Sequence, residues 1–224
     1  MAGPLEMLGE LARQEVQLAP DLRHLELFTM RGLLTVLWHG DVDAPAAVVL
    51  GGGAMGGLLG PADGLYHWLG AELAAPASGI GVLRVGWRRP NDLDLCTVDL
   101  VAAAGLAARA GARSFVTGGH SFGGAIAVRA AMAIGEWGRG VVTFATQSAG
   151  CEGAGGLTAP LLAFHGDVDE LLPVQASEVV CQLAGGPAEL VVCHGAGHLL
   201  TEAGDLLRDQ VPTWIRARLA DDGS

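Results

Sequence analysis

Basic residues are scarce in this chain. Lys and Arg together number 13 against 24 Asp and Glu among 224 residues, so the formal net charge is −11. An acidic surface repels a phosphate backbone, and we therefore expect no nucleic acid among the partners. Charged residues make up only 17% of the chain and hydrophobic residues 50%, a balance that excludes a largely disordered protein.

Cysteines are also few, and their spacing carries no metal or disulfide signature. The four, Cys96, Cys151, Cys181 and Cys193, include no C-x-x-C pair. We expect them to be buried free thiols in a reducing compartment. The sequence therefore predicts no metal site.

Long uninterrupted apolar runs are missing as well. The longest stretch without a charged residue, 44–62, is interrupted by glycines and two prolines. Such a stretch does not predict a helix that spans a bilayer, so we expect no membrane insertion. The first residues have neither the basic start nor the apolar core of a signal peptide, and we expect a cytoplasmic protein.

The sequence does contain a regular alternation of short apolar runs and helix-like segments. Two β-rich runs, 25–29 and 33–38, flank a glycine-containing turn and predict an antiparallel hairpin. Weak helical spacing over 5–18 indicates a surface helix before it. The later expected strands are 46–50, 79–85, 114–117, 141–145, 161–164 and 189–193, and the expected helices are 63–75, 92–110, 122–134, 174–183 and 203–219.

This alternation predicts an α/β fold, in which a mostly parallel sheet carries helices on both faces and the N-terminal hairpin is antiparallel. We find no linker and no internal repeat, and we expect one domain over residues 1–224. Only about 15 residues separate the expected strands at 141–145 and 161–164, which is too few for a cap domain. The oligomeric state is left open.

The segment Gly119-His120-Ser121-Phe122-Gly123 matches G-x-S-x-G. A β run precedes it and an amphipathic helix follows, which is the strand–turn–helix setting of a nucleophile elbow. Glycines two residues either side of Ser121 leave room for the sharp turn. The alternative is a glycine-rich turn between a strand and a helix with no catalytic role.

A serine nucleophile needs a general base, and the base needs a carboxylate that orients it. Among the seven histidines, His198 has the most favourable position, because it follows the last expected strand in a glycine-rich loop at the same sheet edge as Ser121. Three acids follow the strand at 161–164, namely Asp167, Asp169 and Glu170. We favour Asp169 as the orienting acid, and the order nucleophile, acid, base fits a hydrolase.

Acyl transfer also needs two donors for the developing oxyanion. The backbone N–H of Phe122, directly after the nucleophile, is the first candidate. The second should come from the glycine-rich loop after the strand at 46–50, where Gly53 and Ala54 are both possible.

The same loop also reads as G-x-G-x-x-G over 51–56, the dinucleotide-binding fingerprint. Arg88 and Arg89, after the next strand, could then hold a phosphate. The fingerprint requires a helix that opens inside the motif, whereas glycines and Pro61 delay the helix here until about residue 63. A nucleotide-binding oxidoreductase therefore remains an alternative, and otherwise we expect no cofactor.

Substrate contacts are expected from both sides of this sheet edge. Met55 could line an apolar acyl pocket. Trp87 and Arg88 follow a strand at its functional end, where an arginine could hold a substrate carboxylate. Trp87 packed beneath a loop, and arginines paired with some of the acids, are the structural alternatives.

These motifs together resemble the α/β-hydrolase superfamily, and within it the small lidless hydrolases similar to dienelactone hydrolases and short acyl esterases. The resemblance rests on GHSFGG at 119–124, HGDVDELLP at 165–173 and GAGH at 195–198. In that family the acid is the third residue after the loop glycine, which is Asp169 here. Dienelactone hydrolases proper use a cysteine nucleophile, so Ser121 favours ester chemistry.

The sequence therefore predicts a serine hydrolase that cleaves a small or exposed carboxylic ester through an acyl-enzyme. Ser121, His198 and Asp169 would form the triad, with backbone N–H groups of Phe122 and of Gly53 or Ala54 as the oxyanion hole. A small-molecule ester would be the only partner required. A non-catalytic binding protein on the same fold is the alternative from a different functional class.

Overall fold

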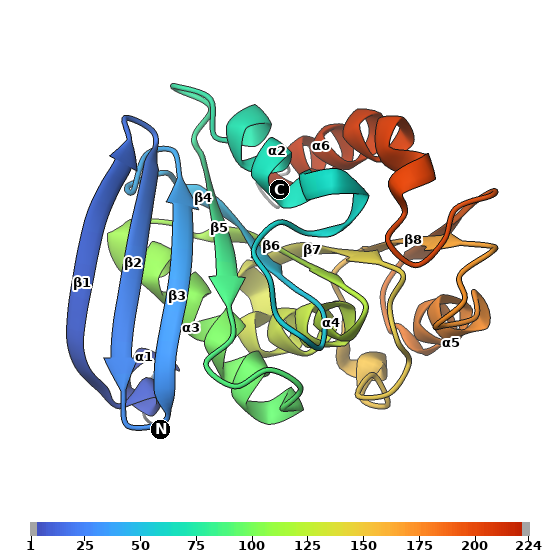
Figure 1. Cartoon of the computed structure of the whole chain (residues 1–224), viewed down its shortest axis with the longest axis horizontal. Coiled ribbons are helices and arrows are strands. Elements are labelled where there is room, and N and C mark those ends of the chain that lie inside the picture. Colours follow the sequence, from blue (N-terminus) through green and yellow to red (C-terminus); the bar gives the residue numbers. More distant parts are fainter. Residues whose placement is uncertain (1–3, 221–224) are drawn as a thin grey trace.

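The computed structural model describes residues 4–220, and within them one mixed sheet runs through the molecule (Figure 1). The strands are β1 (Glu10–Ala19), β2 (Leu22–Thr29), β3 (Gly32–His39), β4 (Ala46–Gly51), β5 (Ile80–Gly86), β6 (Ser114–His120), β7 (Gly138–Phe144), β8 (Leu161–Gly166) and β9 (Ala188–Cys193). The helices are α1 (Pro4–Leu8), α2 (Pro61–Leu73), α3 (Leu93–Ala110), α4 (Phe122–Ile134), α5 (Gln175–Leu183) and α6 (Gly204–Ala220), with short 3₁₀ turns η1 (Gly135–Trp137), η2 (Ala154–Gly156) and η3 (Thr201–Ala203).

The strand order across the described sheet is β1-β2-β3-β5-β4-β6-β7-β8-β9. The pairs β1–β2, β2–β3 and β3–β5 are antiparallel, and every later pair from β5 to β9 is parallel. Strands β4 and β8 are buried along their whole length, as expected for parallel strands covered on both faces. The expected hairpin and the mostly parallel sheet are both confirmed.

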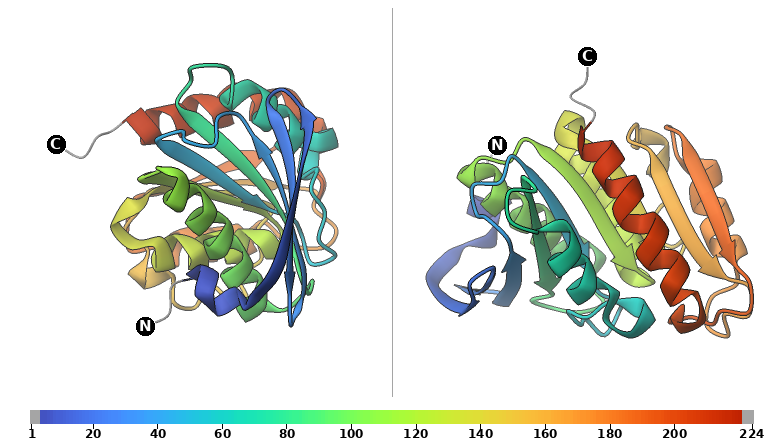
Figure 2. Two further views of the ribbon diagram at one scale, coloured as in Figure 1. Left: turned by 90° about the vertical axis from the view of Figure 1, so that its left-hand side faces the viewer. Right: turned by 90° about the horizontal axis from the view of Figure 1, so that it is seen from above.

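Helices cover the sheet on two sides (Figure 2). Alternate residues of each strand point to opposite faces, and β4 illustrates the division. Val49 joins the apolar cluster beneath α1, α3, α4 and α5. Val48 and Leu50 join the second cluster, beneath α2 and α6. Two apolar layers therefore fix the sheet from both faces and hold its strand ends in place.

The N-terminal segment departs from the sequence-based expectation. Residues 5–18 were expected to form one surface helix, but only α1 is helical and the following residues form β1. Gly9 separates the two elements with φ of 62°, a conformation that ends a helix. Residues 10–19 then pair antiparallel with β2. This pairing supplies hydrogen-bond partners to the outer edge of β2, which a helix in their place would leave open.

The parallel strands bring their carboxyl ends to one edge of the sheet, where the loops after β4, β6, β8 and β9 meet. Between β7 and β8 the chain contains only residues 145–160, with the short turn η2, so no cap covers this edge. No helix of the described residues has both the length and the apolar character that a bilayer crossing requires.

Candidate active site

Ser121 lies at a sharp turn between β6 and α4. Its backbone has φ of 56° and ψ of −118°, a strained conformation for a residue with a side chain. The Ser121 N–H donates to the carbonyl of Phe144 on β7 at 2.8 Å, and this bond fixes the turn to the sheet. The turn presents the hydroxyl at the sheet edge and at the N-terminal end of α4.

The glycines around Ser121 are required by close backbone contacts. A Cβ on Gly119 would overlap the carbonyl of Gly123, and a Cβ on Gly123 would lie 2.6 Å from the Gly51 carbonyl oxygen and closer still to that of Gly52. The G-x-S-x-G pattern thus lets the elbow turn tightly and lets the loop after β4 approach it.

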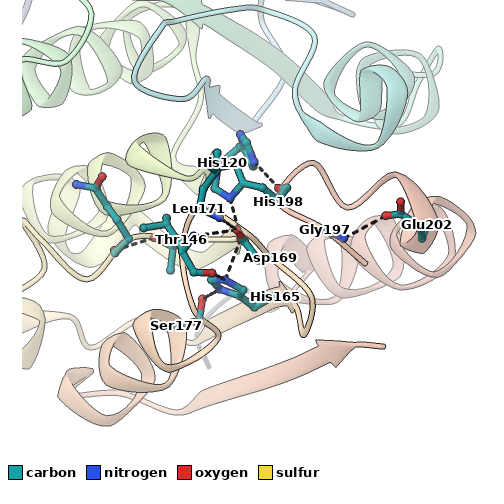
Figure 3. A network of polar contacts seen from close by, with 11 residues as sticks. His120, Thr146, His165, Asp169, Leu171, Ser177, Gly197, His198 and Glu202 are labelled. Carbon is teal, nitrogen blue, oxygen red and sulfur yellow. Dashed lines mark hydrogen bonds and ion pairs between the residues drawn. The ribbon is translucent and has the colours of Figure 1, made fainter. Parts of the chain in front are cut away.

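His198 lies in the loop between β9 and η3, and its imidazole contacts Asp169 (Figure 3). The distance from His198 Nδ1 to Asp169 Oδ2 is 2.7 Å. The carboxyl is completely buried and the imidazole is 12% exposed. The carboxylate accepts a hydrogen bond from Nδ1–H, an arrangement that leaves the lone pair of Nε2 available to take up a proton.

The loop after β8 holds Asp169 in its ionised form. Its Oδ1 accepts hydrogen bonds from the backbone N–H groups of Leu171 at 2.8 Å and Leu172 at 2.9 Å. Burial of the carboxyl acts to raise its pKa, but the hydrogen bonds from Leu172, His198 and Leu171 outweigh burial and hold the pKa of Asp169 below its usual value.

The neighbouring acid Asp167 faces a different histidine. Its Oδ2 lies 2.8 Å from Nδ1 of His194, and its Oδ1 accepts the backbone N–H of Gly195 at 2.7 Å. Asp167 therefore anchors the start of the His198 loop and does not contact His198. Asp167 and Asp169 stand two residues apart in the sequence, but they contact different histidines.

His120, inside the elbow, has a role that the sequence did not reveal. Its Nε2 lies 2.9 Å from the backbone carbonyl oxygen of His198, so the ring N–H donates a hydrogen bond to that oxygen. Burial lowers the pKa of His120 to about 4, and the ring is neutral at neutral pH. The side chain thus ties the Ser121 turn to the loop that carries His198. Glu202 holds the same loop at a second point by accepting the Gly197 N–H at 3.2 Å (Figure 3).

Ser121 and His198 open into one cavity of about 520 Å³ at the carboxyl edge of the sheet. Apolar and glycine residues dominate its walls. The lining residues are Gly52, Gly53, Ala54, Met55, Gly56, Gly57, Leu58, Leu59, Gly60, His120, Ser121, Leu171, His198 and Leu199. Met55, expected as a substrate contact, is part of this wall.

The loop after β4 runs past Ser121. Gly53 is so close that a Cβ placed on it would lie 3.9 Å from Ser121 Cβ. The Gly53 carbonyl accepts the N–H of Gly56 at 2.9 Å and the indole N–H of Trp87 at 3.2 Å, while the Gly52 carbonyl lies 3.3 Å from the same indole nitrogen. In a trans peptide the N–H opposes the C=O, so these contacts turn the N–H groups of Gly53 and Ala54 away from Trp87.

Trp87 and Arg88 do not line the cavity, which corrects the expectation that they contact substrate. Trp87 is buried behind the loop after β4, where its ring fills the space left by the missing Cβ of Gly51. The Arg88 guanidinium is also buried and pairs through Nε with Asp99 of α3, which accepts the Arg88 backbone N–H as well. A buried arginine with this partner is not available to a substrate carboxylate.

The loop after β4 also differs from a dinucleotide fingerprint. Helix α2 begins at Pro61, after Gly60, and not within residues 51–56. Arg88, the expected phosphate contact, is already paired. Within residues 4–220 no cluster of three or more His, Cys, Asp or Glu side chains is arranged to hold a metal ion. The nucleotide-binding alternative thus loses the helix start and one of the two arginines on which it depended.

Comparison with known proteins identifies the fold. No protein-family model and no curated protein sequence matches the chain. Among solved structures, Est1E from Butyrivibrio proteoclasticus matches with a TM-score of 0.68 at 16% identity, over 88% of this chain and 99% of that one. A dienelactone hydrolase from Anabaena variabilis matches with a TM-score of 0.68 at 18% identity, over 92% and 96%.

A third structure is informative about the open sheet edge. XC6422 from Xanthomonas campestris, described as an α/β serine hydrolase without a lid, matches with a TM-score of 0.68 at 19% identity, over 92% of this chain and 98% of that one. The chain therefore has the α/β-hydrolase fold in its lidless form.

Proposed function

We propose that this chain is a serine hydrolase that cleaves small or exposed carboxylic esters through an acyl-enzyme. The observation that carries the proposal is the arrangement of three side chains. Ser121 at the strained turn shares a cavity with His198, and His198 is hydrogen-bonded to the ionised Asp169 at 2.7 Å.

In the first half of the proposed reaction, Ser121 Oγ attacks the acyl carbon while His198 Nε2 takes the hydroxyl proton. The carbonyl π electrons move to the oxygen, and backbone N–H groups of Phe122 and of Gly53 or Ala54 stabilise this oxyanion. When the oxyanion collapses, the bond to the leaving alcohol breaks and His198 returns the proton to that alcohol.

In the second half, water repeats the sequence on the acyl-enzyme. His198 accepts a proton from the water as its oxygen attacks the ester carbon. The tetrahedral intermediate then expels Ser121 Oγ, which recovers its proton from His198. Asp169 stays ionised throughout and stabilises the transient imidazolium. The products are a carboxylic acid and an alcohol.

The comparisons support this proposal at the level of the fold. Solved structures of similar fold include a cold-adapted esterase from an Arctic intertidal metagenomic library, with a TM-score of 0.69, and a monoacylglycerol lipase from Paleococcus ferrophilus, with a TM-score of 0.63. Identities of 15% and 16% leave the substrate to be found by experiment.

Partitioning of the acyl-enzyme tests the proposed reaction. Acetate esters with different leaving groups, such as p-nitrophenol and phenol, should give the same ratio of acetic acid to methyl acetate in buffer that contains methanol. The ratio is constant because both esters pass through one acetyl-enzyme. A ratio that changes with the leaving group would contradict the covalent intermediate, and absence of turnover with every ester would favour the non-catalytic binding protein.

The walls of the cavity indicate a preference for an apolar chain. Met55 is 93% exposed and Leu171 is 72% exposed, and Leu59 and Leu199 are also exposed around the same opening. Exposed apolar side chains gathered at a cavity mouth mark a binding surface. We expect kcat/KM for p-nitrophenyl butyrate to exceed that for the acetate about 4- to 15-fold, since each buried methylene contributes up to about 0.8 kcal/mol.

Substitutions at this rim test its contribution. Leu171→Ser should reduce the preference for butyrate while leaving turnover of the acetate nearly unchanged. Met30→Ser is the matched control, because Met30 is 79% exposed in the turn between β2 and β3, outside the cavity lining. Equal chain-length profiles for wild type and Leu171→Ser would contradict an acyl-binding role for the rim.

The indole N–H of Trp87 holds the peptide groups that carry the proposed oxyanion donors Gly53 and Ala54. Its removal should therefore impair the chemical step. Trp87→Phe keeps an aromatic ring but loses the N–H that holds the Gly52 and Gly53 carbonyls. We expect kcat to fall about 3- to 10-fold with little change in KM, and the free energy of unfolding to fall by about 1 kcal/mol. Steady-state kinetics and chemical denaturation measure both.

Trp137→Phe is the control for the Trp87 substitution. Trp137 lies in η1, half-exposed and stacked on Phe115, and it does not line the cavity. Its substitution should leave kcat unchanged. A loss of kcat equal to that of Trp87→Phe would show that the effect does not arise from the loop after β4.

A further inference from the structure

Asp169 has a second histidine partner in addition to His198. His165 lies at the end of β8 with its side chain fully buried, and its Nε2 is 3.2 Å from Asp169 Oδ2. The same Nε2 is 3.0 Å from the Leu172 carbonyl, and Nδ1 is 2.6 Å from Ser177 Oγ of α5. Figure 3 shows this chain of contacts running from Ser177 through His165 to Asp169 and His198.

The contacts determine which nitrogen of His165 carries the proton. A backbone carbonyl only accepts hydrogen bonds, so the contact with Leu172 places the proton on Nε2. Asp169 Oδ2 lies 3.2 Å from the same Nε2, so the positive end of this N–H group is in contact with the carboxylate. In the neutral ring Nδ1 is then an acceptor, and the Ser177 hydroxyl donates to it.

Asp169 consequently receives donors on both of its oxygens. Oδ1 accepts the backbone N–H groups of Leu171 and Leu172. Oδ2 accepts the His198 ring N–H and also contacts His165 Nε2 at 3.2 Å. Such a carboxylate has its lone pairs largely occupied and cannot rotate without breaking a hydrogen bond. Because His165 and His198 share Oδ2, the position of the His165 ring fixes the oxygen that orients the His198 ring.

We propose that His165 is a positioning residue that holds Asp169 Oδ2 in place for His198, and that Ser177, bonded to Nδ1, anchors the His165 ring in that position. This inference rests on the proposed function. His165 does not line the cavity and so acts only through Asp169.

Two other titratable groups lie close to His165, and both have strongly shifted pKa values. Burial lowers the pKa of His120 to about 4, and burial raises that of Cys193, on the neighbouring strand β9, to about 11. Both are neutral at pH 7. Neither group therefore places a charge beside the contact between His165 and Asp169.

Two amide substitutions separate the two nitrogens of His165. The side-chain nitrogen of His165→Gln can reach about the place of Nε2, so it can still contact Asp169. The shorter His165→Asn places its amide near Nδ1, where it can contact Ser177 but not Asp169. The pair is matched in polarity, and only one member keeps the contact that the proposal invokes.

We expect kcat for ester hydrolysis to fall about 10- to 100-fold in His165→Asn and to stay within about fivefold of wild type in His165→Gln. KM should change less than about threefold in both. The acidic limb of the kcat/KM profile should move to higher pH in His165→Asn, because Oδ2 without the His165 N–H beside it stabilises the His198 imidazolium more strongly. Ser177→Ala, which removes the hydrogen bond that anchors the His165 ring, should lie between the two.

The proton on His198 Nδ1 gives a readout that does not depend on turnover. Its downfield proton resonance, assigned by its loss in His198→Ala, should shift in His165→Asn and Ser177→Ala and stay near the wild-type position in His165→Gln. Equal kcat values and equal resonances in all variants would overturn the role of His165. If His165→Asn fails to fold, the kcat and the His198 Nδ1 resonance of Ser177→Ala test the proposal. A wild-type protein inactive toward every ester would contradict the proposed function, while the resonance would still test the inference.

Discussion

Replacing Ser121 with alanine is expected to lower kcat for ester hydrolysis about 10⁶-fold. The substitution removes the hydroxyl of Ser121, which lies at the strained turn in the cavity wall, and leaves the backbone donors in place. Loss of a triad serine reduces catalysis by about this factor because the remaining groups cannot act alone. The measurement is hydrolysis of p-nitrophenyl acetate at high enzyme concentration, with the spontaneous rate subtracted.

Ser114→Ala is the matched control. Ser114 begins the same strand, β6, so it lies at the opposite end from the elbow. Its substitution should leave kcat within about twofold of wild type. Turnover by Ser121→Ala at more than a few per cent of the wild-type rate would contradict a nucleophilic role for Ser121.

Replacing Asp169 with asparagine is expected to lower kcat about 10⁴-fold. The backbone N–H groups of Leu171 and Leu172 require an acceptor, so the amide oxygen should take the place of Oδ1 and the NH₂ group should face His198. His198 Nδ1 must then accept a hydrogen bond, which moves the ring proton to Nε2. A protonated Nε2 cannot accept the Ser121 proton, and this wrong tautomer accounts for a loss of that size.

Asp167→Asn separates this effect from a general loss of acidic charge. Asp167 lies in the same loop but contacts His194 and Gly195. Its substitution should change kcat less than about fivefold. If the two asparagine variants lost activity to the same extent, the specific pairing of Asp169 with His198 would not be the cause. Chemical denaturation of both variants shows whether either change acts through stability.

The local geometry of the candidate site could be predicted from the sequence because each motif depends on its own stretch of chain. Gly119 and Gly123 flank Ser121 at the spacing that the turn needs, and the structure gives the steric reason for both. The assignment of Asp169 and His198 required only that the two loops lie at one sheet edge, which the alternation of strands and helices predicts. The side-chain contact at 2.7 Å agrees with that assignment.

Arg88 was misassigned because the direction of a side chain after a strand depends on its three-dimensional neighbours. A signal for the correct partner was present in α3. Asp99 stands between the buried Cys96 and Ala103 at helical spacing, so an acid lies on the apolar face of that helix. A buried acid needs a buried cation, and Arg88 supplies it.

The roles of His120 and His165 were missed for a related reason. Both belong to strands whose lengths were underestimated, since β6 extends to His120 and β8 to Gly166. Their partners are the His198 carbonyl and Asp169 Oδ2. No spacing in the sequence indicates contacts that depend on how the loops close over the sheet edge.

The most direct test of the central claim is covalent labelling of the nucleophile. The intact mass of the protein should increase by one adduct after incubation with a fluorophosphonate, and peptide mapping should place that adduct on Ser121. The same treatment of Ser121→Ala should leave the mass unchanged. An unlabelled wild-type protein, or an adduct that persists in Ser121→Ala, would contradict the assignment of Ser121 as the activated nucleophile.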